Sequence, residues 1–253
     1  MVDRQVQLLA SNNCIYSMRF TFLIGLWGLV ACISCGGQGA GPYLYKKGHP
    51  DGISKWYMGR QIAHVMGHQG IGWLERPERE EEEYTSVLLV NMNLKPGEVV
   101  ADIGAGSGYH TFQIAPLVGK DGRVYAVDIQ PEMLAFIETK ARELRMDNIK
   151  LQLGNEQKTS LGAGSVDKIL LVDVYHELSY PFEMALDMLA ALKPGGQLYL
   201  VEFRAEDAAV PIKQLHKMTE KQAVQELEAA GFRFVKNLNN LPWQHCLVFK
   251  KPG

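Results

Sequence analysis

The chain has 253 residues, of which 47 % are apolar and 21 % are charged, a composition typical of globular proteins that excludes wholesale disorder. It carries 26 lysine and arginine residues against 28 aspartate and glutamate residues, a net charge of −2. This balance argues against a protein that binds nucleic acid chiefly by neutralising phosphates. The four cysteines are too few and too scattered to predict a disulfide framework or a zinc site.

The N-terminus carries an almost wholly apolar run, residues 20–33, with Arg19 before it. The run is shorter than the ~20 residues of a transmembrane helix and has the length of the apolar core of a signal peptide. It contains Leu-Val-Ala-Cys ending at Cys32, which resembles the bacterial lipobox, in which the cysteine becomes lipidated. We therefore predict that residues 1–35 are a signal, lipoprotein-like or membrane-anchor segment that associates the chain with a membrane. An uncleaved anchor or a buried helix is the alternative.

Residues 36–84 are predicted to be a linker and a helical cap. The glycine-rich start is typical of a flexible tether. Residues 58–68 have the pattern of a helix, on which His64 and His68 would share a face. Two histidines without a third ligand do not predict a metal site. The glutamate-rich run 78–83 is predicted to be a solvated helix start, because carboxylates favour that end of a helix.

Residues 85–253 are predicted to be one domain in which strands and helices alternate. Strands are expected at residues 99–101, 124–127, 150–153, 168–172 and 197–203, and helices at 84–90, 109–118, 131–144, 182–192 and 219–230. Residues 232–236 and 245–250 are expected to form a closing antiparallel pair. This order predicts an α/β fold, a doubly wound and mostly parallel sheet with helices on both faces. Ligands of such sheets bind at the carboxyl ends of the strands.

The strongest motif follows the first of these strands and consists of Asp102 and three glycines, Gly104, Gly106 and Gly108. Glycines permit a tight turn and a close approach of a ligand to the backbone, and the next helix offers its N-terminus to that ligand. The spacing differs from the G-x-G-x-x-G pattern of dinucleotide-binding proteins. Asp128 ends the next strand, where a carboxylate can accept hydrogen bonds from two ribose hydroxyls.

Together these residues resemble the class I S-adenosylmethionine-dependent methyltransferases, over about residues 85–250. Residues 102–108 match the D-x-G-x-G-x-G motif of that family, Asp128 matches its acidic residue, and residues 192–203 match its L-K-P-G-G turn and fifth strand. The resemblance implies a Rossmann-like fold and S-adenosylmethionine as the cofactor. The implied cofactor site comprises Asp102, Gly104, Gly106, Gly108, Asp128, Asn155 and Asp173.

Purely structural roles stay open for several of these residues. Gly108 can serve helix packing alone, Asp128 can cap the helix that starts at Pro131, and Asn155 can be only a turn residue.

The residues after the fourth strand bear on the methyl acceptor. They read Asp-Val-Tyr-His-Glu-Leu from Asp173 and lack the Asn/Asp-Pro-Pro-Tyr/Phe motif of nucleobase amino-methyltransferases. His176 is therefore a candidate base or acceptor-orienting residue, with Glu177 to orient it, although a purely structural role stays open. We expect a small-molecule acceptor, and a lipid-soluble one if the chain keeps a membrane anchor. Stretches of the chain resemble quinone-biosynthesis C-methyltransferases, and others resemble protein isoaspartyl O-methyltransferases.

Three alternatives remain beside this hypothesis. They are a non-catalytic module that binds S-adenosylmethionine, a protein carboxyl O-methyltransferase, and a nicotinamide oxidoreductase, which the glycine spacing opposes. The predicted lipoprotein signal adds a conflict, because lipoproteins normally face away from the cytosol, where S-adenosylmethionine is made. An uncleaved anchor on the cytosolic side removes that conflict, as does a misassigned start codon or export of a fold that binds something else. The sequence leaves the side of the membrane open.

Overall fold

The structure is a computed structural model that describes residues 41–253. The predicted signal or anchor, residues 1–35 with its Cys32, lies outside the described residues. Within residues 41–253, no helix is both long enough and apolar enough to cross a membrane.

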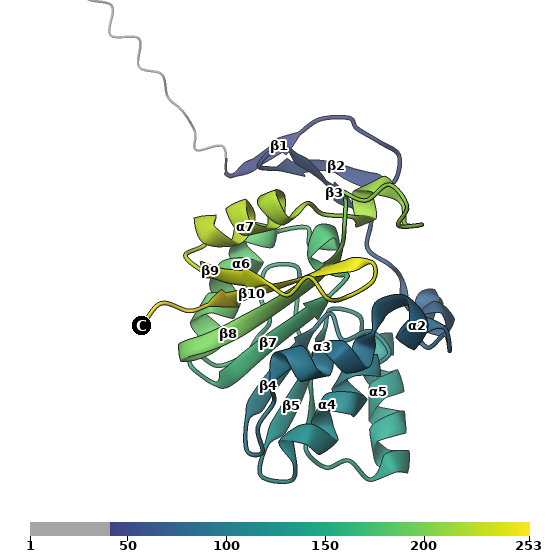
Figure 1. Ribbon diagram of the computed structural model, residues 1–253, viewed down its shortest axis with the longest axis vertical. Helices are drawn as coiled ribbons and strands as arrows, with labels where there is room; N and C mark the ends of the chain where they lie inside the picture. Colours follow the sequence, from purple (N-terminus) through teal and green to yellow (C-terminus); the bar gives the residue numbers. More distant parts are fainter. Residues whose placement is uncertain (1–40) are drawn as a thin grey trace, which may run out of the picture. The chain divides into compact units, whose positions relative to one another are not determined.

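A seven-stranded sheet forms the centre of the described chain (Figure 1). Its strands are β4 (Val99–Ile103), β5 (Arg123–Asp128), β6 (Ile149–Leu153), β7 (Val166–Val172), β8 (Leu192–Phe203), β9 (Arg233–Asn237) and β10 (Gln244–Lys250). They lie in the order β6-β5-β4-β7-β8-β10-β9. The first five are parallel, and β10 pairs antiparallel with both β8 and β9. The predicted doubly wound sheet with a closing antiparallel pair is confirmed.

Helices cover both faces of this sheet, as predicted. They are α3 (Thr85–Met92), α4 (Tyr109–Val118), α5 (Pro131–Leu144), α6 (Pro181–Ala191) and α7 (Glu220–Ala229). Apolar side chains of α3, α4 and α5 pack together with Val100 of β4, whereas those of α6 and α7 pack with the neighbouring Ala101. Successive strand residues point to opposite faces, so β4 is buried on both sides. This explains why its first three residues, 99–101, are all apolar.

The segment that precedes this domain differs from the prediction. Residues 58–68 are not a helix, because an antiparallel sheet of β1 (Tyr43–Tyr45), β2 (Gly52–Tyr57) and β3 (Arg60–Ala63) occupies the region. Met58 and Gly59 both have positive φ, 47° and 91°, and form the two-residue turn between β2 and β3. The turn fixes the register that buries Tyr57 and Ile62. His64 and His68 therefore share no helix face.

Short helices follow this small sheet, namely η1 (His68–Gly70), α1 (Ile71–Leu74) and α2 (Arg79–Glu83). The predicted solvated character of α2 is wrong for Arg79 and Glu83, whose exposed fractions are 5 % and 3 %. Arg79 Nε donates to Glu83 Oε2 at 2.8 Å, and this pairing permits both charges to be buried. The predicted turn at residues 194–196 lies inside β8, where the pairing with β7 shifts register.

Candidate functional site

A cavity of about 630 Å³ opens at the carboxyl ends of the parallel strands. Four strands bring one predicted residue each to its wall: Gly104 follows β4, Asp128 ends β5, Asn155 follows β6 and Asp173 follows β7. The volume falls within the range of pockets that hold small molecules and cofactors. The topology therefore gathers residues that lie far apart in the sequence, at the place where α/β sheets bind ligands.

The glycine loop is shaped by contacts that exclude side chains. Gly104 has φ +69°, and a Cβ atom there would lie 2.3 Å from a methyl carbon of Val174. The amide of Gly104 donates to the carbonyl of Val127 at 2.8 Å. The amide of Gly106 donates to Asp128 Oδ2 at 2.9 Å. Only glycine fits at position 104, and the loop exposes its backbone directly to the cavity.

Asp128 is 6 % exposed and is fixed from two sides. Its Oδ2 accepts from Gly106, and its Oδ1 accepts from the amide of Gln130 at 2.9 Å. Burial raises the pKa of this carboxyl, although the backbone hydrogen bonds act in the opposite direction. The residue that caps α5 is Gln130, so Asp128 is not the helix cap. Each carboxylate oxygen keeps a lone pair with which it can accept from a ligand.

Asp102 and Gly108 do not line the cavity, although both belong to the predicted cofactor set. Asp102 lies behind the loop, where its Oδ2 accepts from the hydroxyl of Thr111 at 2.6 Å. Burial raises the pKa of Asp102 to about 6. Gly108 has φ +79°, and a Cβ atom there would come within 3 Å of Phe112 and Ile137. Both residues hold the loop and α4 in place from behind.

Asn155 and Asp173 both line the cavity but differ in the hydrogen bonds of their side chains. Asn155 Oδ1 accepts from the amides of Gln157 and Lys158 at 2.9 and 3.0 Å, so the side chain also closes a turn. Asp173 has φ +53°, and its Oδ2 accepts from Gln244 at 3.0 Å. Its Oδ1 is buried and has no hydrogen-bond partner among the described residues. A strained residue with an unpartnered polar atom on a cavity wall is typical of a functional site.

His176 lies on η2 (Tyr175–Glu177), where it is buried and lines the same cavity. Its Nδ1 lies 2.6 Å from Glu202 Oε2, and its Nε2 lies 3.1 Å from Nδ1 of His216. Glu202 also accepts from the amide of Tyr175 at 2.8 Å. The predicted orienting role of Glu177 thus falls to Glu202. Burial alone would lower the pKa of His176, but the carboxylates of Glu202 and Glu177 outweigh burial and raise the pKa to about 10.

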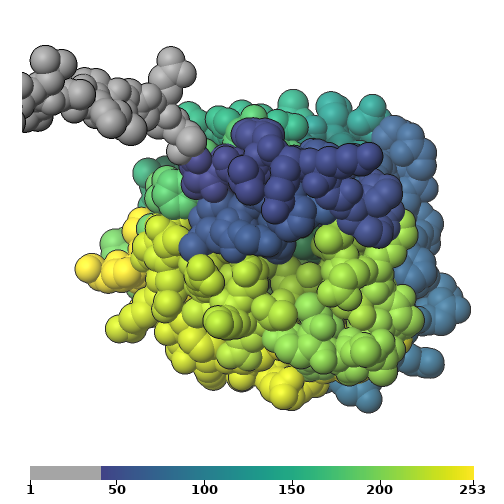
Figure 2. Space-filling model, turned by 90° about the horizontal axis from the view of Figure 1, so that it is seen from above, coloured from purple at the N-terminus to yellow at the C-terminus, as the bar shows by residue number. Residues whose placement is uncertain are grey.

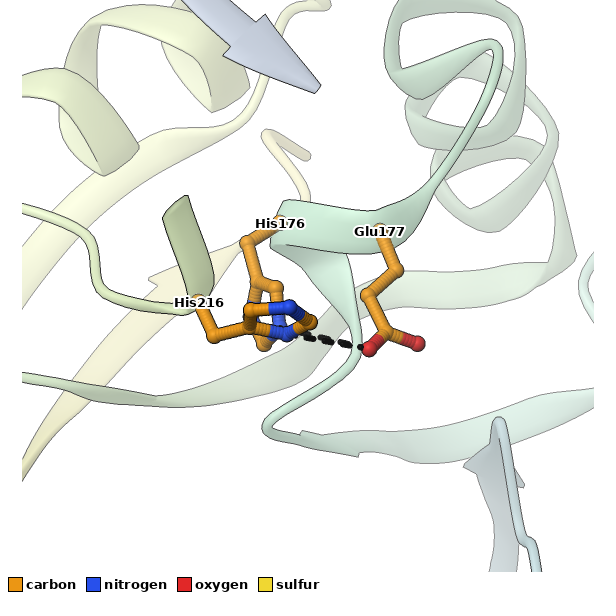
Figure 3. A group of neighbouring side chains, drawn as sticks. All are labelled: His176, Glu177 and His216. Carbon is orange, nitrogen blue, oxygen red and sulfur yellow. Dashed lines mark hydrogen bonds and ion pairs between the residues drawn. The ribbon is translucent and has the colours of Figure 1, made fainter. Parts of the chain in front are cut away.

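Glu177, the next residue of η2, approaches the imidazoles of both His176 and His216. Its Oε1 lies 3.2 Å from Nδ1 of His216 and 3.6 Å from Nε2 of His176. Its Oε2 accepts from the amide of Met66 at 3.0 Å. Burial acts to raise the pKa of Glu177, but the two imidazoles lower it to about 2. His216 belongs to η3 (Gln214–His216), a separate segment, and Figure 3 shows the three side chains converging.

The small N-terminal sheet holds this end of the cavity in position. Arg60 of β3 donates from Nη1 to the carbonyl of His176 at 3.0 Å, and its Nε donates to Glu226 of α7 at 2.8 Å. Figure 2 shows this sheet, in purple, against the yellow-green part of the chain that carries η3, and β3 contacts η3 directly. Within the predicted linker and helical cap, residues 43–63 thus form a sheet that braces η2, and the short helices lie in residues 68–83.

Side chains from the segment before β4 complete the cavity wall. Three of them, Val65, Met66 and Trp73, are apolar yet 53 %, 37 % and 48 % exposed. Two arginines also line the cavity: Arg76 stacks over the Trp73 ring at 3.9 Å, and Arg79 pairs with the buried Glu83. The sequence contained a signal for the buried pair, because an arginine and a glutamate at i and i+4 share a helix face.

Residues 94–243 match the model of a family described as a methyltransferase domain. The match spans more than half of the 253-residue chain. The chain belongs to the methyltransferase domain family. The match begins just before β4 and ends just before β10, so it covers the strand ends that line the cavity.

Known proteins agree with this assignment. The methyltransferase domain is similar to the crystal structure of a SAM-dependent methyltransferase from Aquifex aeolicus, with a TM-score of 0.70 and 26 % identity over 74 % of this chain and all of that one. It is 35 % identical over 113 residues to a protein-L-isoaspartate O-methyltransferase from Methanococcus aeolicus, and 27 % identical over 111 residues to a demethylmenaquinone methyltransferase from Bacillus mycoides.

These matches cover 45 % and 44 % of this chain, and the chain spans about half the length of these curated relatives, 50 % and 47 %. The family and its structural neighbours identify S-adenosylmethionine as the cofactor of the methyltransferase domain.

Proposed function

We propose that this chain transfers a methyl group from S-adenosylmethionine to a small apolar acceptor held in the same cavity. The observation that carries the proposal is that Gly104, Asp128 and Asp173 line one continuous cavity with His176. A cofactor end and an acceptor end in one space suit methyl transfer, because this chemistry depends chiefly on holding two reactants in line.

The polar end of the cavity suits the cofactor. Asp128 would accept from the ribose hydroxyls, the loop at Gly104 and Gly106 would lie along the ligand, and Asn155 would approach the adenine. Asp173 Oδ1 has no protein partner among the described residues, as expected of an atom that accepts from a ligand. When bound, S-adenosylmethionine supplies an electrophilic methyl group on a sulfonium. These features support the predicted site, with Asp102 and Gly108 as supports of the loop.

The exposed apolar part of the cavity wall suits an apolar acceptor. Val65, Met66 and Trp73 expose apolar surface there, which water solvates poorly and an apolar ring or chain would cover. His176 would orient the acceptor, because its ring lines the cavity and is fixed through Nδ1 by Glu202. The predicted anchor in residues 1–35 would keep the domain at a membrane, where apolar molecules concentrate. The proposed acceptor is not a nucleic acid.

The experiment that tests the proposal is an acceptor screen with methyl-labelled S-adenosylmethionine and the purified full chain. Quinol-type and other ring-containing lipid extracts form one arm, and peptides that contain isoaspartate form the other. We expect label in the lipid arm, and much less of it with Asp128→Asn at limiting S-adenosylmethionine, which controls for contaminating enzymes. Label in neither arm, from a protein that binds the cofactor, would contradict the proposal and favour a non-catalytic module.

Protein carboxyl O-methylation is the second candidate. The relative from Methanococcus aeolicus, whose name gives this activity, favours it. Label in the isoaspartate arm alone would replace the first proposal with this one.

A further inference from the structure

We infer that His176, Glu177 and His216 form a binding site for one divalent first-row transition-metal ion, facing the acceptor end of the cavity. The inference rests on the proposed function only for the role of the ion, which would bind an oxygen of the acceptor. The site itself follows from distances, burial and charge. The sequence gives no sign of it, because His176 and His216 are 40 residues apart.

The three ligand atoms are spaced for a single ion. Nε2 of His176, Nδ1 of His216 and Oε1 of Glu177 are separated by 3.1, 3.2 and 3.6 Å. The circle through these points has a radius of about 1.9 Å, so an ion about 2.1 Å from all three fits just outside their plane. The angles between the bonds would be about 95° to 120°, from near the octahedral value to somewhat above the tetrahedral one. Figure 3 shows the three side chains in this arrangement.

In His176 and Glu177, the polar side-chain atom that would not bind the ion already has a partner in the protein. Nδ1 of His176 lies 2.6 Å from Glu202 Oε2, the carboxylate–histidine pairing that orients metal-binding imidazoles and directs Nε2 to the ion. Oε2 of Glu177 accepts from the amide of Met66 at 3.0 Å, which leaves Oε1 for the ion. The ligands are therefore held in place before an ion arrives.

The local charge also calls for a cation. The side chains of Glu177 and Glu202 are 7 % and 0 % exposed, and within residues 41–253 their ion pairs are with histidines alone. Buried carboxylates are normally paired with cations or bind metals. A divalent ion bound to neutral imidazoles would balance both charges at once, in place of a proton on His176.

The site has a side open to a substrate. All three residues line the cavity that also contains Asp128 and Asp173. Two histidines and one carboxylate leave coordination positions free, as in catalytic zinc sites and non-haem iron sites. An ion there would bind a hydroxyl or carbonyl oxygen and lower the pKa of the hydroxyl. The acceptor class that fits is therefore an apolar molecule that carries such an oxygen, for example a quinol.

The test uses the full chain after chelation, titrated with Zn²⁺ by equilibrium dialysis and with Co²⁺ by visible absorption. We expect one equivalent of each to bind. His216→Ala, whose side chain is 22 % exposed, should lower the affinity about 100-fold or more, and Glu202→Gln about 10- to 100-fold. The matched control is His64→Ala, because His64 is an exposed histidine of the same cavity outside the cluster. Its affinity should equal that of the wild type.

The site is refuted if the wild type binds neither ion, or if His216→Ala binds as tightly as the wild type does. A strong thiolate-to-cobalt charge-transfer band would place the ion on cysteines and would also refute it. S-adenosylhomocysteine is titrated into the same samples. Binding of this product without binding of Zn²⁺ would overturn the metal site alone, whereas binding of Zn²⁺ without binding of the product would overturn the proposed function alone.

Discussion

Replacing Asp128 by asparagine tests the cofactor site at its best-defined carboxylate. The substitution keeps the shape of the side chain but removes its charge and turns one oxygen into a donor. In the structure Oδ1 and Oδ2 each accept one backbone amide, from Gln130 and Gly106, at 2.9 Å. Asparagine can serve only one of those amides, and its new amide group would face the other donor.

The loss of a hydrogen bond to a charged group costs about 1.5–3 kcal/mol. We therefore expect the Kd for S-adenosylhomocysteine to rise about 10- to 150-fold in Asp128→Asn. Isothermal titration of the full chain measures this value, and Asp147→Asn, at an exposed aspartate outside the cavity, is the matched control. If a folded Asp128→Asn bound the ligand as tightly as the wild type, the assignment of Asp128 to the ribose hydroxyls would be refuted.

Three further substitutions test the supports of the site. Gly104→Ala should destabilise the fold and abolish cofactor binding. The control is Gly164→Ala, where φ is +60° but no atom lies within 4 Å of an added Cβ, so the cost should be only left-handed strain of about 1–2 kcal/mol. Urea unfolding and ligand titration compare the two variants. Glu83→Gln should lower the free energy of unfolding by about 3 kcal/mol, because buried arginines lose their carboxylate, and exposed Glu81→Gln should leave it unchanged. The pKa of Asp102 is about 6 in the folded state, above its value in the unfolded state, so the folded state binds the proton more tightly. Protonation of Asp102 therefore stabilises the fold at low pH, and this stabilisation is lost as the pH rises from 4 to 6. The unfolding free energy of the wild type relative to Asp102→Asn should thus fall by up to about 3 kcal/mol between pH 4 and pH 7, and a flat difference would contradict the raised pKa.

Much of the central domain could be predicted from the sequence because its strands are buried on both faces. The inner part of β7, residues 169–172, is such a strand segment, and its continuous apolar run stands out between helices. The carboxylates at strand ends could also be predicted to meet, since parallel strands bring their carboxyl ends to one edge. Asp128 and Asp173 are placed by that rule alone.

The N-terminal sheet and the histidine cluster could not be predicted in the same way. Strands β1 and β3 have three and four residues, too few for periodicity to distinguish them from a helix. His216 reaches His176 through tertiary packing that no local pattern encodes. Glu202 is the one charged residue among residues 198–203, and a buried carboxylate requires a partner, but nothing in the sequence identifies that partner as His176.

The most direct test of the central claim is a calorimetric titration of S-adenosylmethionine into the folded full chain, with NAD as the comparison ligand. We expect one molecule of S-adenosylmethionine to bind per chain, with micromolar affinity, and NAD not to bind. Binding of NAD, or no binding of S-adenosylmethionine to a chain shown to be folded, would contradict the assignment of the cavity to this cofactor.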